Sequence, residues 1–576
     1  MDTRNRSIPK RTFLRRPQCF REMSFLICNK PESFYSVHLC EYKIIRMERL
    51  SGSNRKWVAF LGKSLYNGRM EKRKIRINEA WLTAVTILYF YLPIFLFLFT
   101  WVKWYFAVIV SALLIPAVAR MVYDYRKDGW EELTIGYGTC TTIVILVLLF
   151  AYYMGYTGGA PQCADWNKHN AVLHDLTTRK WPVYYETRER SMLTYYIAQY
   201  LVPAMLGKLC ASFSVTQWAL FFWNGTGILL VLIHLFYAVR AQNWKKQLGT
   251  LAVFFFFGGM LPIAQQLLSI LFGISIGAQY DYFHFLNIEG YFLQYRSNLV
   301  SMRWVFPQCI VPWIAMLMLT RHRERIEHYA VLVIPVLLFG ILPTLGLVVF
   351  AVVYVCKILV EKKGSITEWK RLFSPWNLMT LFGLGSVLLL YFGGNIFSDK
   401  PKEIGFQIVR YGGKHILIYL LFCLFMFGIY ALCVFRKNSQ NVMFWTAVAS
   451  LTIIPLFHMG SWNDFCMGVS IPALFYLMTA VLRFLWERAE DMRTGMIKGA
   501  LIVCLFIGAI YPVGELYQII ADDRIGEQQV MDLDFSMQSY ADRFRNDIGY
   551  DMQYNYYTYD VEDDIFVQFL ARKKKH

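Results

Sequence analysis

Long apolar stretches alternate with short polar stretches along most of this chain. Stretches such as Trp81 to Trp101 and Tyr411 to Phe435 hold mostly apolar residues over roughly 20 positions, the length a helix needs to cross a hydrocarbon layer about 30 Å thick. They lack the alternation of barrel strands, and only helices or closed barrels satisfy their backbone groups in lipid. The pattern therefore predicts an all-α polytopic bundle.

We expect about 13 transmembrane helices. They lie near residues 81–101, 104–122, 136–154, 215–238, 249–273, 303–320, 329–342, 344–360, 375–395, 412–435, 441–457, 468–485 and 497–514. The pair on either side of Pro343 has basic residues at both ends, which is typical of a re-entrant hairpin. We interpret Met192 to Leu209 as a Tyr-rich interfacial helix, because a span there would move two basic loops across the membrane.

Composition and charge support this class of protein and assign the two sides of the membrane. Hydrophobic residues make up 56% of the chain, above the share of about 45–50% in soluble domains. The net charge of +19 comes largely from the first 80 residues and from short loops, a distribution typical of cytoplasmic anchoring. We therefore predict a multi-pass protein of the cell membrane that contacts membrane lipid and no nucleic acid. Its N-terminus would be cytoplasmic and its C-terminus extracytoplasmic.

Polarity also divides the chain into three parts. Residues 1–69 are basic and are expected to form a disordered cytoplasmic tail, unless translation starts at Met47 or Met70. Residues 70–514 form the transmembrane domain, with a large extracytoplasmic loop at 155–214. Residues 515–576 are expected to form a small outer cap.

Four groups of polar residues fall on the predicted outer side, so we expect any chemistry to face outward. The groups are Asp165, Lys168, His169 and Asp175; Asp281, His284, Glu289, Arg296 and Arg303; Arg410, Lys414 and His415; and His458, Asn463 and Asp464.

The first group has the pattern of a transfer site. A helix from Asp165 to Arg179 places Asp165, Lys168 and His169 on one face. The carboxylate can take a proton from an attacking hydroxyl while the two basic side chains neutralise a leaving phosphate. The alternative is that Asp165 caps the helix and its companions lie on a solvated face.

The second group is open to two interpretations. Arg296 and Arg303 suit bidentate binding of a substrate phosphate or of lipid headgroups. Asp281, His284 and Glu289 could supply a second acid or a metal site, or belong to an aromatic belt with snorkelling polar groups.

The remaining groups carry weaker signals. His415 follows two glycines at a helix start, where free N–H groups favour an anion. Asn463-Asp464 could act at the site or cap the following span. Cys163 and Cys466 both fall in predicted outer loops, where a disulfide could join them.

Several of these runs resemble a known family. Gly158-Gly159, Asp165 to Leu173 (DWNKHNAVL) and Trp181 to Tyr184 (WPVY) resemble the first large outer loop of bacterial membrane proteins akin to the GT-C glycosyltransferases. Asn463 to Leu474 also resembles a pattern of such proteins, with Gly468 where a basic residue is expected. The resemblance implies a GT-C-like fold, a polyprenyl-phosphate sugar donor and an acidic residue as base or metal-linked acid. It assigns the base role to Asp165 and substrate contacts to Lys168 and His169.

We therefore expect a membrane glycosyltransferase that moves a sugar from a polyprenyl-phosphate carrier to a cell-envelope glycan, lipid or protein. Asp165, Lys168 and His169 are the catalytic candidates. The substrate-binding candidates are Asp175, Glu289, Arg296, Arg303, His415 and Asp464. The resemblance leaves open a divalent cation, Mg or Mn, without naming its ligands.

Two other classes of protein compete with this interpretation. A polysaccharide polymerase or ligase that acts on lipid-linked oligosaccharides would depend on Arg296, Arg303 or His415 more than on Asp165. A non-enzymatic lipid or polysaccharide transporter would carry ionisable residues deep in its spans, where this sequence has few.

Overall fold

The computed structural model describes eleven stretches of the chain, all within one unit, Gly68–His576. They are residues 74–128, 132–186, 190–273, 286–288, 291–396, 404–406, 413–459, 463–521, 536–539, 556–558 and 561–572. The expected tail 1–69, with both alternative start positions, lies outside the described residues.

Helices make up most of the described part, as predicted. The helices of the bundle are α4 (Glu79–Trp101), α5 (Trp104–Lys127), α6 (Tyr137–Tyr153), α9 (Phe213–Ala238), α10 (Trp244–Phe256), α11 (Leu261–Phe272), α13 (Ile310–Arg321), α14 (Tyr329–Val333), η3 (Ile334–Leu338), α15 (Ile341–Glu361), α17 (Pro375–Thr380), η4 (Leu381–Gly385), α18 (Ser386–Ile396), α20 (Gly413–Cys423), η5 (Leu424–Gly428), α21 (Ile429–Asn438), α22 (Val442–Ile453), η6 (Ile454–Leu456), α23 (Asp464–Trp486), α24 (Met492–Gly508) and α25 (Ile510–Ala521).

Shorter elements join these helices at the two ends of the bundle. The short helices are α7 (Trp166–Thr178), α8 (Ala198–Leu209), α12 (Asn298–Trp304), η1 (Phe306–Gln308), η2 (Ile326–His328), α16 (Ile366–Leu372) and η8 (Phe566–Leu570). The strands are β1 (Lys74–Ile77), β2 (Leu133–Gly136), β3 (Tyr184–Glu186), β4 (Arg190–Leu193), β5 (Leu286–Ile288), β6 (Tyr291–Leu293), β7 (Ile404–Phe406), β8 (Phe457–Met459) and β9 (Tyr557–Thr558). They pair antiparallel as β1-β2, β3-β4-β9, β5-β6 and β7-β8.

Among the described residues, nine helical segments are long and apolar enough to cross a membrane. They are α4, α5, α9, α10 with α11, α15, α16 to α18, α20 to α21, α23, and α24 with α25. A tenth candidate consists of α12 and the helix from Phe306 to Arg321, which meet at a bend of 120°. Three further apolar helices, Tyr137–Tyr153, Ile326–Leu338 and Val442–Leu456, are shorter. Each expected span thus lies largely in helix, and the chain is a polytopic helical bundle.

Side-chain caps explain where many of these helices begin. The Asn78, Ser212, Asn243 and Asn441 side chains each accept a hydrogen bond from the first turn of α4, α9, α10 and α22. Such a bond satisfies an N–H group that has no partner within its own helix.

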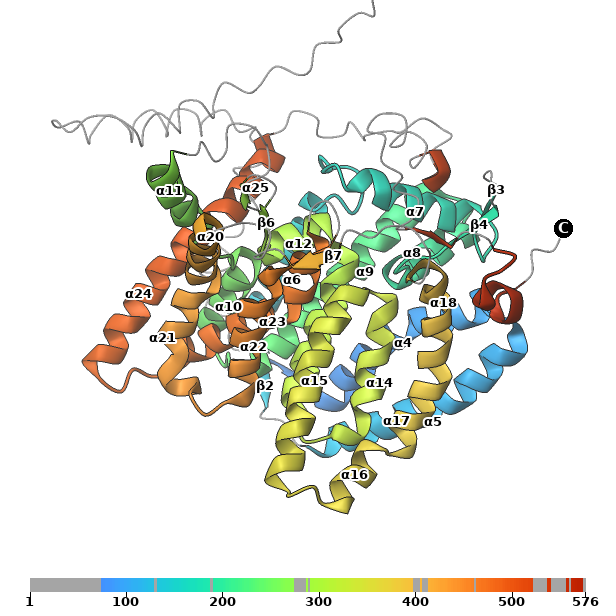
Figure 1. Cartoon of the computed structure of the whole chain (residues 1–576), viewed down its shortest axis with the longest axis horizontal. Coiled ribbons are helices and arrows are strands. Elements are labelled where there is room, and N and C mark those ends of the chain that lie inside the picture. Colours follow the sequence, from blue (N-terminus) through green and yellow to red (C-terminus); the bar gives the residue numbers. More distant parts are fainter. Residues whose placement is uncertain are drawn as a thin grey trace, which may run out of the picture. The chain divides into compact units, whose positions relative to one another are not determined.

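Loops predicted to lie outside the membrane share one end of the bundle. Thr558 of β9 pairs with Met192 of β4, and the Lys103 N–H donates to the Leu570 carbonyl over 2.7 Å. The pairing of β7 with β8 joins two further outer loops. In Figure 1, α7, β3, β4 and β6 lie towards the upper end of the bundle and α16 lies at the lower end.

The predicted cytoplasmic loops meet at the opposite end. Strand β1 pairs with β2, and the Lys246 ammonium donates to the Trp486 carbonyl over 2.8 Å. Ion pairs hold the other loops there: Arg325 with Asp128 at 2.5 Å, Arg371 with Glu327 at 2.8 Å and Lys437 with Glu490 at 2.5 Å. The predicted grouping of loops is therefore confirmed, while the choice of cytoplasmic end stays a prediction.

Helix α8 differs from the interfacial helix that the sequence predicts. Gln199, in its first turn, donates to the Asn224 side chain over 2.5 Å, and it also donates to the Tyr89 hydroxyl over 2.8 Å. Asn224 lies about 17 Å along α9 from its start, and the C-terminal end of α8 is joined to that start by a short turn. The first turn of α8 therefore lies beside the middle of α9, while the last turn of α8 lies beside the start of α9. Helix α8 thus runs antiparallel along the first half of α9.

The last span also extends further than expected. Helix α25 continues to Ala521, seven residues beyond the expected end of the last span at 514, while the boundary of the transmembrane domain stays a prediction. Glu515, the first residue of the expected cap, lies within this helix and is buried in an ion pair with Arg303. The described parts of the expected C-terminal cap, including β9, pack onto the 155–214 loop and the α4–α5 turn.

The grouping of loops predicts that Cys210 and a thiol introduced at position 439 react from opposite sides of the membrane. Cys210 is exposed beside the predicted outer end, and Ser439 is exposed at the other end. We expect a membrane-impermeant maleimide to label Cys210 in intact cells and a Ser439→Cys variant only after permeabilisation, as read by mass spectrometry of the labelled peptides. Labelling of both thiols from one side would contradict the two-ended grouping, and the reverse order would overturn the predicted orientation.

Candidate functional site

Asp165 occupies the N-cap position of α7, yet its side chain makes no capping hydrogen bond. The carboxylate instead lies 3.6 Å from the Lys168 ammonium, one helical turn away. The Asp165 side chain is 32% exposed, whereas that of Lys168 is only 11% exposed. The capping explanation of Asp165 is therefore wrong, and its carboxylate remains accessible from solvent.

Neighbouring cations keep this carboxylate ionised. Burial alone would raise the pKa of Asp165, but Lys168, His169 and Arg296 together lower it below its usual value. Because burial also lowers the pKa of His169 to about 3, Lys168 and Arg296 are the cations near Asp165 at neutral pH. Asp165 thus has the charge state that a proton acceptor needs.

Asp464 joins the same cluster from a distant part of the sequence. Its neighbour Asn463 is the N-cap of α23 and accepts a hydrogen bond from the Cys466 N–H over 3.3 Å. The capping explanation is therefore confirmed for Asn463. The exposed Asp464 carboxylate lies within electrostatic range of Lys168, Arg296 and Asp165.

Arg296 reaches the cluster from the segment before α12. Its Nε donates to the Gln294 side chain over 3.3 Å, and its guanidinium lies 5.6 Å from the centre of the Trp304 ring. The buried Nη1 atom has no hydrogen-bond partner among the described residues. Arg296 therefore keeps one buried N–H group that donates to no described residue.

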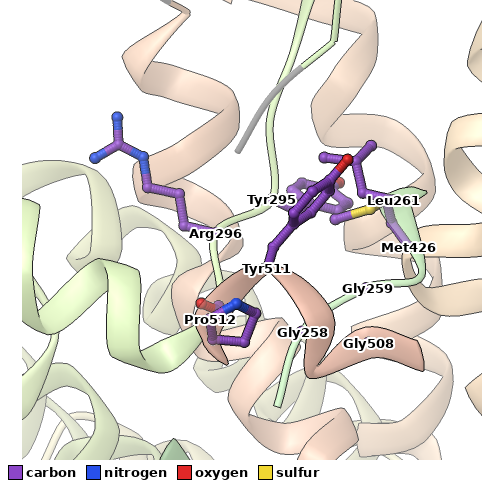
Figure 2. A pocket seen from close by; sticks show the side chains of 10 residues that line it. Gly258, Gly259, Leu261, Tyr295, Arg296, Met426, Gly508, Tyr511 and Pro512 are labelled. Atoms are coloured by element: carbon purple, nitrogen blue, oxygen red, sulfur yellow. The ribbon is translucent and has the colours of Figure 1, made fainter. Parts of the chain in front are cut away.

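A small pocket lies on the other side of the Arg296 backbone. Three glycines, Gly258, Gly259 and Gly508, line it together with Tyr295, Met426 and neighbouring residues. Figure 2 shows the Arg296 side chain pointing away from this pocket. Its volume of about 20 Å³ suits a water molecule, so the pocket itself is too small for a sugar.

Tyr196, which no sequence pattern singled out as a site residue, borders the cluster. Its hydroxyl oxygen accepts hydrogen bonds from Gln308 over 2.7 Å and from the Tyr195 hydroxyl. Burial raises the pKa of Tyr196, so the hydroxyl keeps its proton near Lys168, Asp464 and Asp165. The only sequence signal was the density of tyrosines between 192 and 209.

The position of His169 does not fit its expected catalytic role. Its Nε2–H donates to the Trp304 carbonyl over 2.9 Å, and its Nδ1 accepts from the Tyr200 hydroxyl over 2.6 Å. The side chain is 1% exposed. With both nitrogens engaged and no access to solvent, His169 holds α7 in place and does not face a substrate.

Arg303 and Asp175 are also engaged inside the protein. Arg303 Nη1 lies 2.6 Å from the Glu515 carboxylate, in a pair that is almost fully buried. Asp175 accepts hydrogen bonds from the Tyr185 hydroxyl at 2.8 Å, the Met537 N–H at 2.9 Å and Arg179 Nε at 3.1 Å. Both residues therefore join segments of the fold through these contacts.

The other candidate residues are either buried or lie outside the described residues. His415 is buried on α20, which packs against α11 and β6. Glu289, like Asp281, His284 and Arg410, lies outside the described residues. Within the described ranges, no three His, Cys, Asp or Glu side chains gather as a metal site would require.

No disulfide joins Cys163 and Cys466. Cys163 and Cys466 are both free and buried. The Cys163 thiol donates to the Arg303 carbonyl over 3.8 Å, and the Cys466 thiol donates to the Gln294 carbonyl over 3.3 Å. Each thiol thus has a separate backbone partner.

Packing explains why glycine occupies position 468. A Cβ atom there would lie 2.6 Å from the Cβ of Leu342 on α15, which is closer than real contacts allow. A basic side chain at this position would separate α23 from α15, so the family pattern cannot be met here.

Comparison with protein-family models, with curated proteins and with solved structures finds no match for this chain.

The buried ion pair predicts that Arg303 and Glu515 matter for stability. Arg303→Met would leave the Glu515 carboxylate buried without its cation, which typically costs about 3–5 kcal/mol. We expect a lower unfolding midpoint in detergent for Arg303→Met and a clear recovery in the Arg303→Met/Glu515→Met double variant. A single variant as stable as the wild type would show that the pair is not formed.

The environment of His169 predicts a pH dependence of stability. Its pKa falls from 6.5 to about 3 on folding, so the stability from the neutral ring is complete above pH 6.5 and is lost as the pH falls towards 3. The loss approaches about 1.4 kcal/mol per pH unit. We expect the unfolding midpoint to fall less steeply between pH 6.5 and 5 in His169→Gln, whose amide can still donate to Trp304. Parallel curves for the two proteins would contradict a buried neutral His169.

Proposed function

We propose that this protein is a membrane glycosyltransferase of the GT-C type, acting on a polyprenyl-phosphate sugar at the extracytoplasmic surface. The observation that carries the proposal is the convergence of Asp165, Lys168, Arg296 and Asp464 from three segments of the chain. An accessible carboxylate beside two cations suits a reaction that removes a proton and releases a phosphate.

In the proposed reaction, Asp165 takes the proton of an acceptor hydroxyl, and that oxygen attacks the anomeric carbon of the donor sugar. The bond between this carbon and the phosphate oxygen breaks, and the carrier phosphate leaves with the bonding electrons. Lys168 and Arg296 neutralise its charge, for which the Nη1 donor of Arg296 is available. Asp464 and Tyr196 border the space in which the acceptor would bind.

The environment of Arg303 weighs against the polymerase or ligase alternative. Of the three residues on which that alternative relies, Arg303 is paired with Glu515 and His415 is buried on α20, which leaves Arg296 as its one candidate among them. The carboxylate of Asp165 is the more accessible group, which supports the single-transfer reaction.

The proposal predicts a specific loss of activity in Asp165→Asn. The amide cannot accept the proton, so we expect transfer from a polyprenyl-phosphate sugar to fall by about 10²- to 10⁴-fold in proteoliposomes. The variant should lose the charge attraction to Lys168 but no capping bond, so we expect a smaller fall of the unfolding midpoint than in Asp175→Asn.

Asp175→Asn is the matched control on the same helix. Its carboxylate is fully buried among three donors, so the exchange should lower the unfolding midpoint. Turnover retained by Asp165→Asn would refute the base assignment.

A further inference from the structure

Trp304 stands at the 120° bend where α12 ends and the following helix turns away. Its carbonyl, its ring and its indole nitrogen each contact a different side chain around the charge cluster. We infer that Trp304 is a positioning residue that sets the placement of Arg296 relative to Asp165 and Lys168. This inference rests on the proposed function, since it concerns the same site.

The Trp304 carbonyl holds α7. Carbonyl groups in the last turn of a helix accept no hydrogen bond from within it, and Trp304 is the last residue of α12. His169 Nε2–H donates to this carbonyl over 2.9 Å. Because His169 is adjacent to Lys168 and one turn from Asp165, this bond connects the end of α12 to the carboxylate and ammonium of the site.

The Trp304 ring holds Arg296. The guanidinium lies 5.6 Å from the ring centre, within the range of a cation–π attraction. Its Nε donates to Gln294 at 3.3 Å, which is long for such a bond. The ring face and Gln294 thus orient the Arg296 side chain, and they leave its Nη1 without a hydrogen-bond partner in the described part of the chain.

The indole nitrogen anchors Trp304 to α25. Nε1 donates to Glu515 Oε1 over 3.2 Å, and the same oxygen pairs with Arg303 Nη1 at 2.6 Å. Tryptophan supplies both an aromatic face and an N–H donor. Phenylalanine at this position would keep the face and lose the donor, whereas leucine would lose both.

A double-mutant cycle on the ligand-free protein tests the inference directly. Arg296→Met should change the unfolding midpoint of the wild type and of Trp304→Phe, which both present an aromatic face to the guanidinium. It should have a smaller effect in Trp304→Leu. Additive effects of Arg296→Met and Trp304→Leu would overturn the inference, because residues that do not interact show no coupling.

Kinetics in proteoliposomes separate positioning from general stability. For Trp304→Leu we expect the KM of a polyprenyl-monophosphate sugar to rise about threefold to thirtyfold and kcat to fall, because Arg296 meets both the donor phosphate and the charge that develops as it leaves, with the pH profile of kcat unchanged. For Trp304→Phe we expect the KM to stay within about twofold of the wild type, although the lost bond to Glu515 lowers the unfolding midpoint.

The two experiments also separate the inference from the proposed function. Equal rises in KM for the Phe and Leu variants would overturn the positioning role, because the KM would then depend on the lost stability and not on the aromatic face. A wild-type protein that turns over no polyprenyl-phosphate sugar would refute the proposed function. The ligand-free cycle would still decide whether Trp304 orients Arg296.

Discussion

Buried backbone groups must be hydrogen-bonded within the protein, and this constraint governs the short elements and turns near the charge cluster. Side chains satisfy several of their carbonyls. Tyr156 donates to Met302 over 2.9 Å, Tyr391 donates to Leu193 over 3.2 Å, and Gln162 donates to Gly155 over 2.8 Å. The bond from His169 to Trp304 belongs to the same set. The groups that make irregular backbone tolerable inside the bundle therefore also fix the positions of the charged residues.

Charged residues near this end of the bundle fall into two kinds. Arg303 and Glu515 form a close pair at 2.6 Å with side chains that are 10% and 6% exposed. Asp165 and Lys168 lie 3.6 Å apart, and the Asp165 side chain is 32% exposed. The first pair is neutralised internally and joins α12 to α25. The second leaves part of its carboxylate accessible, and with Arg296 and Asp464 it presents charges of both signs to a ligand.

This distinction supports the proposed transfer reaction in a specific way. A base for a hydroxyl must be ionised and reachable, and only part of the predicted set meets both conditions. Asp165 meets them, whereas Asp175 is fully buried among its donors. Lys168 and Arg296 provide the positive charge, and the neutral His169 contributes by holding α7 against α12.

The length of the apolar stretches by itself determined that this chain is a polytopic helical bundle, because an apolar stretch long enough to span lipid has few other stable conformations. Basic residues determined which loops share an end. The same reasoning placed Asp165, Lys168, Arg296 and Asp464 on one side, since parity depends only on counting spans.

Only the tertiary structure decided which polar residues are available to a ligand. Arg296 and Arg303 are seven positions apart and look alike in sequence, yet Glu515, more than two hundred residues away, neutralises one and not the other. His169 likewise looks like a companion of Asp165 until Tyr200 and the Trp304 carbonyl engage both of its nitrogens. The availability of a charge depends on partners distant in the sequence, and a local pattern of residues does not contain them.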